Sequence, residues 1–347
     1  MTITEIAREA HVSIATVDRV LHNRGRVSEE TKQKIEHIMQ AGGYQPNLFA
    51  RTLRTGAIKF GILMVDPKTR KVPGYWEMVR QGCLDAVQDF ANLPIKLEIK
   101  YFVSQISGDL LKKGREFIAE GVKGLLFSPL SREDTISLMN ELKDIPYGFY
   151  DADFPDAKPV TDTTQNPYLA GKTAGRMMQL LASTTQGICV MFNKTSAHNI
   201  AGRLAGFVDS FPEIEKPVEL VIDESKELKP QIKSFLTEHP NLNGIFVLHS
   251  ASTILVEVLN ELHVVNRPRI IGFDDIPANR NLLERGEIDC IISQDPYGQG
   301  YRAVRQMALY LSLGTTVAES LHTPVTILLK ENIATYRNTR LRSNLSS

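Results

Sequence analysis

Cysteine is scarce in this sequence. Its 347 residues include only three cysteines, Cys83, Cys189 and Cys290, which are odd in number and far apart. They fit neither a disulfide framework nor a paired-thiolate metal site, so we expect a reducing, cytoplasmic setting and no metal.

Long hydrophobic runs and an excess of one charge are also missing. The longest apolar runs, such as 124–127 and 245–248, fall far short of the roughly 20 residues that span a bilayer. The first residues lack a basic segment leading into an apolar one, so we expect no secretory signal and no membrane partner. Lys plus Arg and Asp plus Glu each number 40. The chain as a whole therefore has no excess of positive charge that would indicate a nucleic-acid partner.

The composition is that of a globular chain, with 42% hydrophobic and 23% charged residues. The length predicts two or three compact units. Near residue 57 the sequence pattern changes from one typical of short helices to one typical of alternating strands and helices. Through Lys59 there are nine basic and six acidic residues, so a head of about +3 precedes a body of about −3.

Three short helices are predicted in the head. Thr2 and Glu5 form a capping-box pattern, and Ser13 and Ser28 are expected to cap the second and third helices. The tight turn 11–13 between the first two helices gives the layout of a helix-turn-helix. The expected core positions are Ile6, Ala7, Ala10, Val17, Val20, Leu21, Ile35, Ile38 and Met39.

Four spaced segments, 4–21, 27–31, 43–47 and 50–56, resemble the DNA-binding head of the LacI/GalR family of bacterial transcriptional regulators. Two positions depart from that family. It usually has Gly where this chain has His11, and Ser where this chain has Asp18. An acid on the recognition helix repels phosphate, so Asp18 either reads a cytosine amino group or points along the surface.

Side-chain chemistry assigns roles within this head. Ile14 and Ala15 open the recognition helix and suit shape and thymine-methyl contact, while Arg19 can grip guanine. Thr16, Asn23, Arg24 and Arg26 suit phosphate contacts, although solvated positions are an equal alternative for Thr16 and Arg24. The full set of expected DNA-binding residues is Thr4, Ser13, Ile14, Ala15, Thr16, Arg19, Asn23, Arg24, Tyr44, Asn47, Ala50, Leu53 and Arg54.

Residues 47–53, bounded by Pro46 and Gly56, are too short to form a stable isolated helix. The resemblance implies a hinge helix that orders on DNA and pairs with its twin in the minor groove. Leu53 stands where the family places a leucine wedge between base pairs. The alternative is a plain linker residue.

Ten strands are predicted in the body, with helices between most of them, which indicates parallel sheets. They are 58–66, 95–103, 124–128, 147–151, 187–193, 218–222, 244–248, 270–273, 290–293 and 325–330. This number is large for one sheet and resembles the two-lobed periplasmic sugar-binding fold. The resemblance implies three crossings between lobes, near 152–165, 290–296 and 320–324.

The fold class is therefore an all-α helix-turn-helix head with a hinge helix, followed by a two-lobed, periplasmic-binding-protein-like α/β domain with doubly wound parallel sheets. We place the head at 1–45, the hinge at 46–56, the effector-binding and dimerisation domain at 57–338 and a tail at 339–347. Lobe 1 is expected at about 57–155 and 294–321, and lobe 2 at about 162–290 and 324–338.

Ligand is expected in the cleft, at the carboxyl ends of the strands. A carboxylate, a guanidinium and an aromatic plate suit a polyol ring. The expected effector-binding residues are Asp66, Tyr75, Trp76, Ser128, Asp151, Asn199, Arg203, His249, Asp274 and Gln294. His249-Ser250 departs from the Asn-Asp that the family often has here, so unusual ligand chemistry is expected.

Five of these residues also have a structural alternative. Asp274 and Arg203 could form a structural salt bridge, and Tyr75 and Trp76 could be core aromatics. Asp66 could only cap a turn.

No Walker loop, Gly-x-Ser-x-Gly elbow or His-Glu-x-x-His pair indicates catalysis, so we expect neither an enzyme nor a cofactor. The resemblance implies a homodimeric regulator on a pseudo-palindromic operator, most simply a repressor controlled by a carbohydrate effector. Alternatives are a cytosolic solute-binding sensor, a regulator with a nucleobase-type corepressor, and a sequence-tolerant architectural DNA binder.

Overall fold

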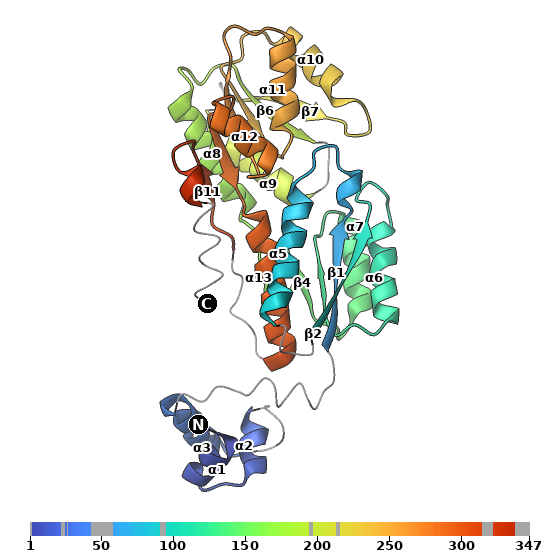
Figure 1. The fold of residues 1–347 in the computed structure, drawn as a ribbon, viewed down its shortest axis with the longest axis vertical. Helices are drawn as coiled ribbons and strands as arrows, with labels where there is room; N and C mark the ends of the chain where they lie inside the picture. Colours follow the sequence, from blue (N-terminus) through green and yellow to red (C-terminus); the bar gives the residue numbers. More distant parts are fainter. Residues whose placement is uncertain are drawn as a thin grey trace.

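The computed structural model describes residues 2–21, 25, 27–42, 58–90, 95–193, 197–212, 216–313 and 322–336. Three α-helices form the N-terminal head, and two sheets with their flanking helices form the body (Figure 1). Within these residues, no helix has the length and hydropathy needed to cross a membrane.

The head contains α1 (Ile3–Ala10), α2 (Ile14–Leu21) and α3 (Glu29–Ala41). The predicted capping box is present: Glu5 Oε2 accepts from Thr2 N at 2.7 Å, and Thr2 Oγ1 accepts from Glu5 N at 3.3 Å. The hydroxyls of Ser13 and Ser28 each accept from the backbone N–H three residues later. All three predicted caps are confirmed.

One small apolar core holds the head together. Buried residues of this cluster are Ile6, Ala7, Ala10, Val17, Ile35 and Ile38, with Val20, Leu21 and Met39 partly buried against it. His11 caps α1 with φ of 56°, the left-handed conformation, and its N–H reaches Ala7 O and Arg8 O. A side chain in this conformation costs about 1–2 kcal/mol relative to glycine. This is the energetic consequence of having His11 where the family usually has Gly.

Lobe 1 is built on a five-stranded parallel sheet in the order β2-β1-β3-β4-β5. Its strands are β1 (Ile58–Val65), β2 (Ile95–Phe102), β3 (Leu125–Phe127), β4 (Tyr147–Phe149) and β5 (Thr161–Asp162). The helices α5 (Tyr75–Asp89) and α13 (Pro296–Leu313) lie together on one face, and α6 (Asp109–Ala119) and α7 (Arg132–Leu142) cover the other (Figure 1).

Strand β5 was not predicted, because 152–165 was expected to cross between the lobes. β5 pairs with β4 through Thr161 and Asp162, so the first sheet extends past the lobe boundary predicted at 155. Two residues are too few to show a strand period in the sequence.

Lobe 2 is built on a six-stranded sheet in the order β11-β10-β9-β8-β6-β7. Its strands are β6 (Ile188–Asn193), β7 (Val218–Ile222), β8 (Gly244–Val247), β9 (Arg269–Phe273), β10 (Cys290–Ser293) and β11 (Thr326–Leu328). The predicted parallel pairing is confirmed for the other five strands, whereas β11 runs antiparallel to β10. An antiparallel edge strand is common on such sheets because the chain returns at its edge.

Helices cover both faces of the second sheet. Cys189 and Met191 belong to the core beneath α10 (Leu228–Glu238), α11 (Ser252–Glu261) and α12 (Pro277–Arg285). Ile188 and Val190 belong to the opposite core, beneath α8 (Pro167–Leu181) and α9 (His198–Val208). A strand buried on both sides must be apolar at every position, which explains the unbroken apolar runs.

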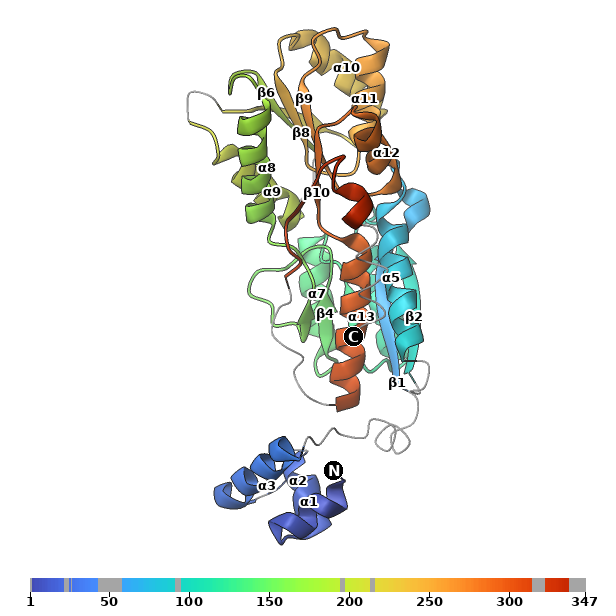
Figure 2. The same cartoon turned by 60° about the vertical axis from the view of Figure 1, so that its left-hand side comes forward.

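The three predicted crossings meet and bond to one another between the lobes (Figure 2). Gln165 Nε2 donates to Ser293 O and to Pro324 O, each at 3.0 Å. Thr323 N donates to Thr164 O at 2.7 Å. These bonds tie the three connections into one hinge region.

Candidate functional site

The start of α2 presents an apolar surface to solvent. Ile14 is 53% exposed, and Ala15 beside it is exposed as well. Arg19, one turn further along the same helix, is also exposed. An isoleucine left uncovered at a helix start suits contact with a partner surface, as expected for base readout.

Other predicted head residues have mixed positions. Thr4 is exposed. The Ser13 hydroxyl is occupied by the cap of α2 and by the Thr16 hydroxyl at 2.9 Å. The remaining predicted residues lie outside the described part of the chain, and their roles stay predictions: Asn23, Arg24, Arg26, Tyr44, Asn47, Ala50, Leu53 and Arg54.

A cavity of about 380 Å³ lies between the lobes, at the carboxyl ends of strands of both sheets. Open α/β sheets bind ligands at this edge. Most of the predicted effector-binding residues line it, namely Tyr75, Trp76, Asp151, Asn199, Arg203, His249, Asp274 and Gln294.

Two predicted residues do not line the cavity. The carboxylate of Asp66 caps the 3-10 turn η1 (Pro67–Thr69), accepting from Lys68 N at 3.0 Å. The alternative of a turn cap is therefore the observed role of Asp66. Ser128 lies behind the cavity wall, where its hydroxyl donates to Asp151 Oδ2 at 2.8 Å.

Asp151 is held from three sides. Besides Ser128, the Tyr75 hydroxyl donates to Asp151 Oδ1 at 2.7 Å, and Asp151 N donates to Gln299 Oε1 at 2.6 Å. Burial raises the pKa of Asp151, while these hydroxyl donors oppose the shift. Asp151 and Asp274 both have φ of 68°. Such left-handed residues are enriched at binding sites, where the surrounding structure supports the strain.

Arg203 and Asp274 share Gln294. Gln294 Oε1 accepts from Arg203 Nη2 at 2.9 Å, and its Nε2 donates to Asp274 Oδ1 at 2.7 Å. Among the described ion pairs none joins Arg203 to Asp274, so the direct salt bridge considered above is not formed. Burial raises the pKa of Asp274 to about 7, against the opposing charge of Arg203. Burial also lowers the pKa of Arg203.

The neighbouring acid Asp275 has a separate role. Its Oδ2 pairs with Arg280 Nη2 at 2.5 Å, and its Oδ1 accepts from the Ser293 hydroxyl at 2.7 Å. Asp274 and Asp275 therefore face different surroundings, which argues against a carboxylate pair.

The aromatic wall is packed as well as exposed to the cavity. Trp76 stands edge-on to Tyr75, with ring centroids 5.0 Å apart, and edge-on to Tyr150 at 6.3 Å. Trp76 and Tyr75 are each only 7% exposed. They are core residues that also line the cavity, and their contact with an effector stays a prediction.

One set of polar contacts in the cavity lining was not predicted from the sequence. Arg70, Asn193 and Glu224 form it, and it is called the clasp here. Arg70 Nη2 lies 3.1 Å from Glu224 Oε1, which also accepts from Asn193 Nδ2 at 2.5 Å. Asn193 ends a predicted strand, so the strand-end argument could have found it. Arg70 and Glu224 are 154 positions apart and lie in loops, which leaves no sequence signal for their pairing.

Other lining residues were also not predicted: Val65, Val72, Ser104, Gln105, Leu130, Ala197, Ile200, Asp223, Ser225 and Ser250.

Four buried polar atoms of the lining have no hydrogen-bond partner among the described residues: Asn193 Oδ1, Asn199 Oδ1, Arg203 Nε and His249 Nε2. A buried polar atom without a partner costs about 1–3 kcal/mol. Such atoms gathered around one cavity indicate a site made to bond a polar ligand.

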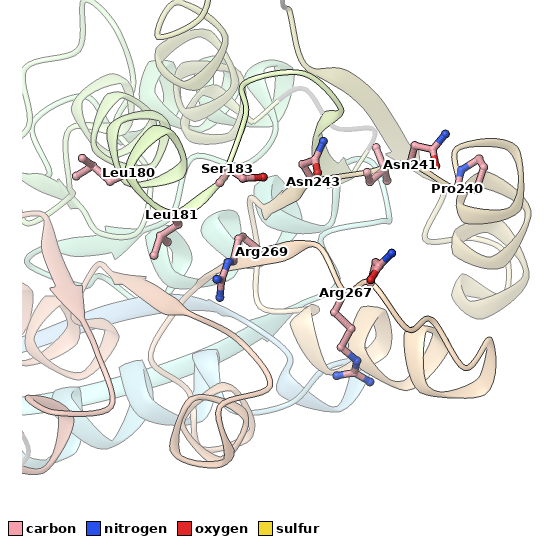
Figure 3. A pocket seen from close by; sticks show the side chains of 11 residues that line it. Leu180, Leu181, Ser183, Pro240, Asn241, Asn243, Arg267 and Arg269 are labelled. Atoms are coloured by element: carbon pink, nitrogen blue, oxygen red, sulfur yellow. The ribbon is translucent and has the colours of Figure 1, made fainter.

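A second cavity, of about 510 Å³, lies at the amino ends of β8 and β9 (Figure 3). Its lining includes Arg267, Arg269 and Asn243, and none of the unpartnered buried atoms belongs to it. Arg269 is occupied by Asp289 at 3.0 Å. This second cavity therefore lacks the convergent polar groups without partners that line the cavity between the lobes.

A three-helix head with an exposed recognition helix, joined to a two-sheet body with a polar cavity at its hinge, defines a DNA-binding regulator with a ligand-sensing domain. Residues 2–47 match the profile of bacterial regulatory proteins of the lacI family, and residues 64–316 match the periplasmic binding protein domain. The chain therefore combines a lacI-family DNA-binding head with a body that belongs to the periplasmic binding protein domain family.

Similar proteins include the HTH-type transcriptional regulator DegA of Bacillus subtilis, which is 26% identical over 290 residues, or 79% of this chain and 81% of DegA. The regulator RegA of Clostridium saccharobutylicum is 34% identical, but the match spans only 41% of each chain. The glucose-galactose binding protein GanP of Geobacillus stearothermophilus shares the fold, with a TM-score of 0.67 and 23% identity over 80% of this chain and 99% of GanP.

Proposed function

We propose that the protein is a cytoplasmic repressor that binds a pseudo-palindromic operator as a homodimer and is controlled by a small carbohydrate effector in the cavity between the lobes. In this proposal residues 1–45 read DNA, 46–56 form the hinge, and 57–338 bind effector and dimerise. The observation that carries the effector site is the group of unpartnered donors and acceptors around a cavity at the strand ends.

The size and chemistry of the cavity suit a sugar-sized ligand. Its carboxylates accept from hydroxyl groups, Arg203 donates, and Trp76 gives an apolar edge to C–H groups. That GanP is a glucose-galactose binding protein supports the same ligand class.

The mechanism follows from where the cavity lies. Ligand contacts both lobes at once, so binding favours one arrangement of the lobes around the hinge region. In a dimer, a change in lobe arrangement alters the spacing of the two chains that enter at residue 57, and with it the pairing of the hinge segments. The effector acts only through its different affinity for the two states.

The test has two stages. Thermal-shift screening of sugars, sugar acids, phosphates and nucleobases identifies a ligand, because a compound that binds the folded chain raises its melting temperature. Operator binding is then measured with and without that ligand, on a site selected from random duplexes. We expect a sugar to bind and to weaken operator binding, and Arg203→Ala to abolish the response while the chain stays folded.

Three outcomes contradict the proposal. Tighter operator binding with a nucleobase indicates a corepressor-dependent regulator. No preference for any duplex at fixed salt indicates an architectural binder, and no DNA binding at all indicates a solute-binding sensor.

A further inference from the structure

The His249 ring has a fixed hydrogen-bonding direction. It follows β8, and its Nδ1 accepts a hydrogen bond from Ala251 N at 3.2 Å. In a neutral imidazole one nitrogen accepts and the other carries the proton. Nε2 of His249 is therefore an N–H donor, and it is buried without a partner in the described part of the chain.

The surroundings keep this ring neutral. Burial lowers the pKa of His249 to about 3, and the charges of Arg70 and Arg203 act in the same direction. The ring therefore does not become an imidazolium near neutral pH, and the Nε2–H donor persists.

An acceptor lines the same cavity as this donor. Strands β6 and β8 are parallel neighbours in the second sheet. Asn193 is the last residue of β6 and His249 follows the end of β8, so both lie at the carboxyl ends of adjacent strands. Asn193 Nδ2 is occupied by Glu224, which leaves Asn193 Oδ1 as an acceptor, and this atom also lacks a partner. The two atoms do not bond each other.

A hydroxyl group completes this arrangement. Its oxygen can accept from His249 Nε2 while its hydrogen goes to Asn193 Oδ1, which satisfies both buried atoms at once. A carboxylate or phosphate oxygen has no hydrogen for Asn193. The whole lining also disfavours an anion, because four carboxyl groups (Asp151, Asp223, Glu224 and Asp274) stand against two guanidinium groups (Arg70 and Arg203).

We propose that His249 and Asn193 together bind one hydroxyl group of an uncharged polyol effector and that this pair determines which polyol the protein accepts. The inference rests on the proposed function and adds to it the specificity-determining pair and the exclusion of phosphorylated sugars. A site made for a hydroxyl strongly rejects an analogue without it, because its own polar groups are then left unpaired.

The probes are neutral pentoses, hexoses and hexitols, their monodeoxy derivatives and their phosphates, with affinity measured by calorimetry. In the wild-type chain we expect a neutral polyol to bind, its phosphate to fail, and one monodeoxy derivative to bind roughly 10- to 100-fold more weakly. In His249→Ala the affinity for the parent polyol should fall by about the same factor. The parent and that monodeoxy derivative should then bind with equal affinity.

Two further variants separate the hydrogen bond from packing. Asn and Asp have the same shape, but only Asn donates, so His249→Asn should bind the polyol more tightly than His249→Asp. His37→Ala, at an exposed position on α3 of the head, is the matched control and should leave polyol affinity unchanged.

The failures are distinguishable. If no neutral polyol binds the wild-type chain, the proposed effector class and this inference both fall. If a polyol binds but His249→Ala keeps full affinity and the same preference over every monodeoxy derivative, only this inference is wrong. Tighter binding of the phosphate than of the parent also overturns it.

Discussion

Asp274 holds its carboxyl group in a site where ionisation is unfavourable. Burial raises its pKa to about 7, against about 4 in an unfolded chain. Between these pH values the folded chain keeps a proton that the unfolded chain has lost. The stability linked to Asp274 is therefore fully present below pH 4 and is lost as the pH rises to 7.

Asp274→Asn should remove this loss, because an amide does not ionise. The free energy of unfolding of the variant minus that of the wild type should increase from pH 4 to pH 7, by on the order of a few kcal/mol, and then stay constant. Urea unfolding of the ligand-free protein from pH 4 to pH 7 measures this difference in the free energy of unfolding. The control is Asp156→Asn at an exposed position, for which the difference should not vary with pH. A difference that does not vary with pH would contradict the buried position of Asp274.

Arg19 offers a prediction for the head. It is exposed on α2, on the helix that begins with the uncovered Ile14. Arg19→Ala should weaken specific binding by about 1–3 kcal/mol and relax the choice of base at one operator position. Selection from random duplexes followed by anisotropy titration tests this. Arg8→Ala, exposed on α1, should leave base preference unchanged, and an equal loss of Arg19→Ala affinity on every duplex would exclude base readout.

The sequence predicted single residues well where one local rule applies. The Thr2–Glu5 capping box depends on residues three apart, and Asp274 directly follows a strand. Asp66 met the same strand-end rule but is followed by Pro67, and its carboxylate turns back to cap the next residues. The rule gives the position of a side chain, whereas its direction depends on the next turn.

Among the elements, α8 and α9 pack through glycines. A Cβ at Gly171 would lie 2.1 Å from Arg203 O, and one at Gly206 would lie 2.1 Å from Tyr168 O. The two backbones are therefore in direct contact. Because Arg203 stands at this contact, the approach of the helices places its guanidinium over Phe273, 3.8 Å from the ring centroid.

Gly171→Ala should push α9 away from α8. We expect a loss of about 1–3 kcal/mol of stability and a weaker effector affinity, because Arg203 moves with the helix. Denaturant unfolding and calorimetry measure the two effects. Gly114→Ala in α6 is the control, since the atoms nearest its Cβ would belong to the Leu138 side chain rather than to backbone. Unchanged effector affinity in Gly171→Ala would show that helix approach does not position Arg203.

Elements with strong apolar patterns were predicted nearly to the residue, as 218–222 and 290–293 show. β5 was not predicted because its two residues are too few to show a strand pattern. The antiparallel direction of β11 was not predicted because strand direction depends on where the chain returns to the sheet. The Arg70–Glu224 clasp was missed for a related reason: its partners come from different lobes, and only the folded hinge brings them together.

For the whole molecule, sensing requires coupling between the cavity and the head. An effector that changes operator affinity should do so by about 1–3 kcal/mol, or roughly 5- to 150-fold. Operator DNA must then change effector affinity by the same factor. Anisotropy titrations with effector and calorimetry with operator duplex measure the two factors independently. Two different factors, or none, would rule out the coupling.

The crossing of α13 back onto lobe 1 has a consequence for biosynthesis. Ala303, Val304 and Met307 complete the core of lobe 1, so that lobe cannot close until after helices α8 to α12 of lobe 2 have left the ribosome. The core of the head is complete at Met39. Since domains fold as they emerge, a nascent or prematurely terminated chain carries a folded helix-turn-helix head with neither a working sensor nor a complete dimerisation domain. Under the proposed function such a fragment could not pair its heads on an operator, so truncated products would not compete with the full-length regulator.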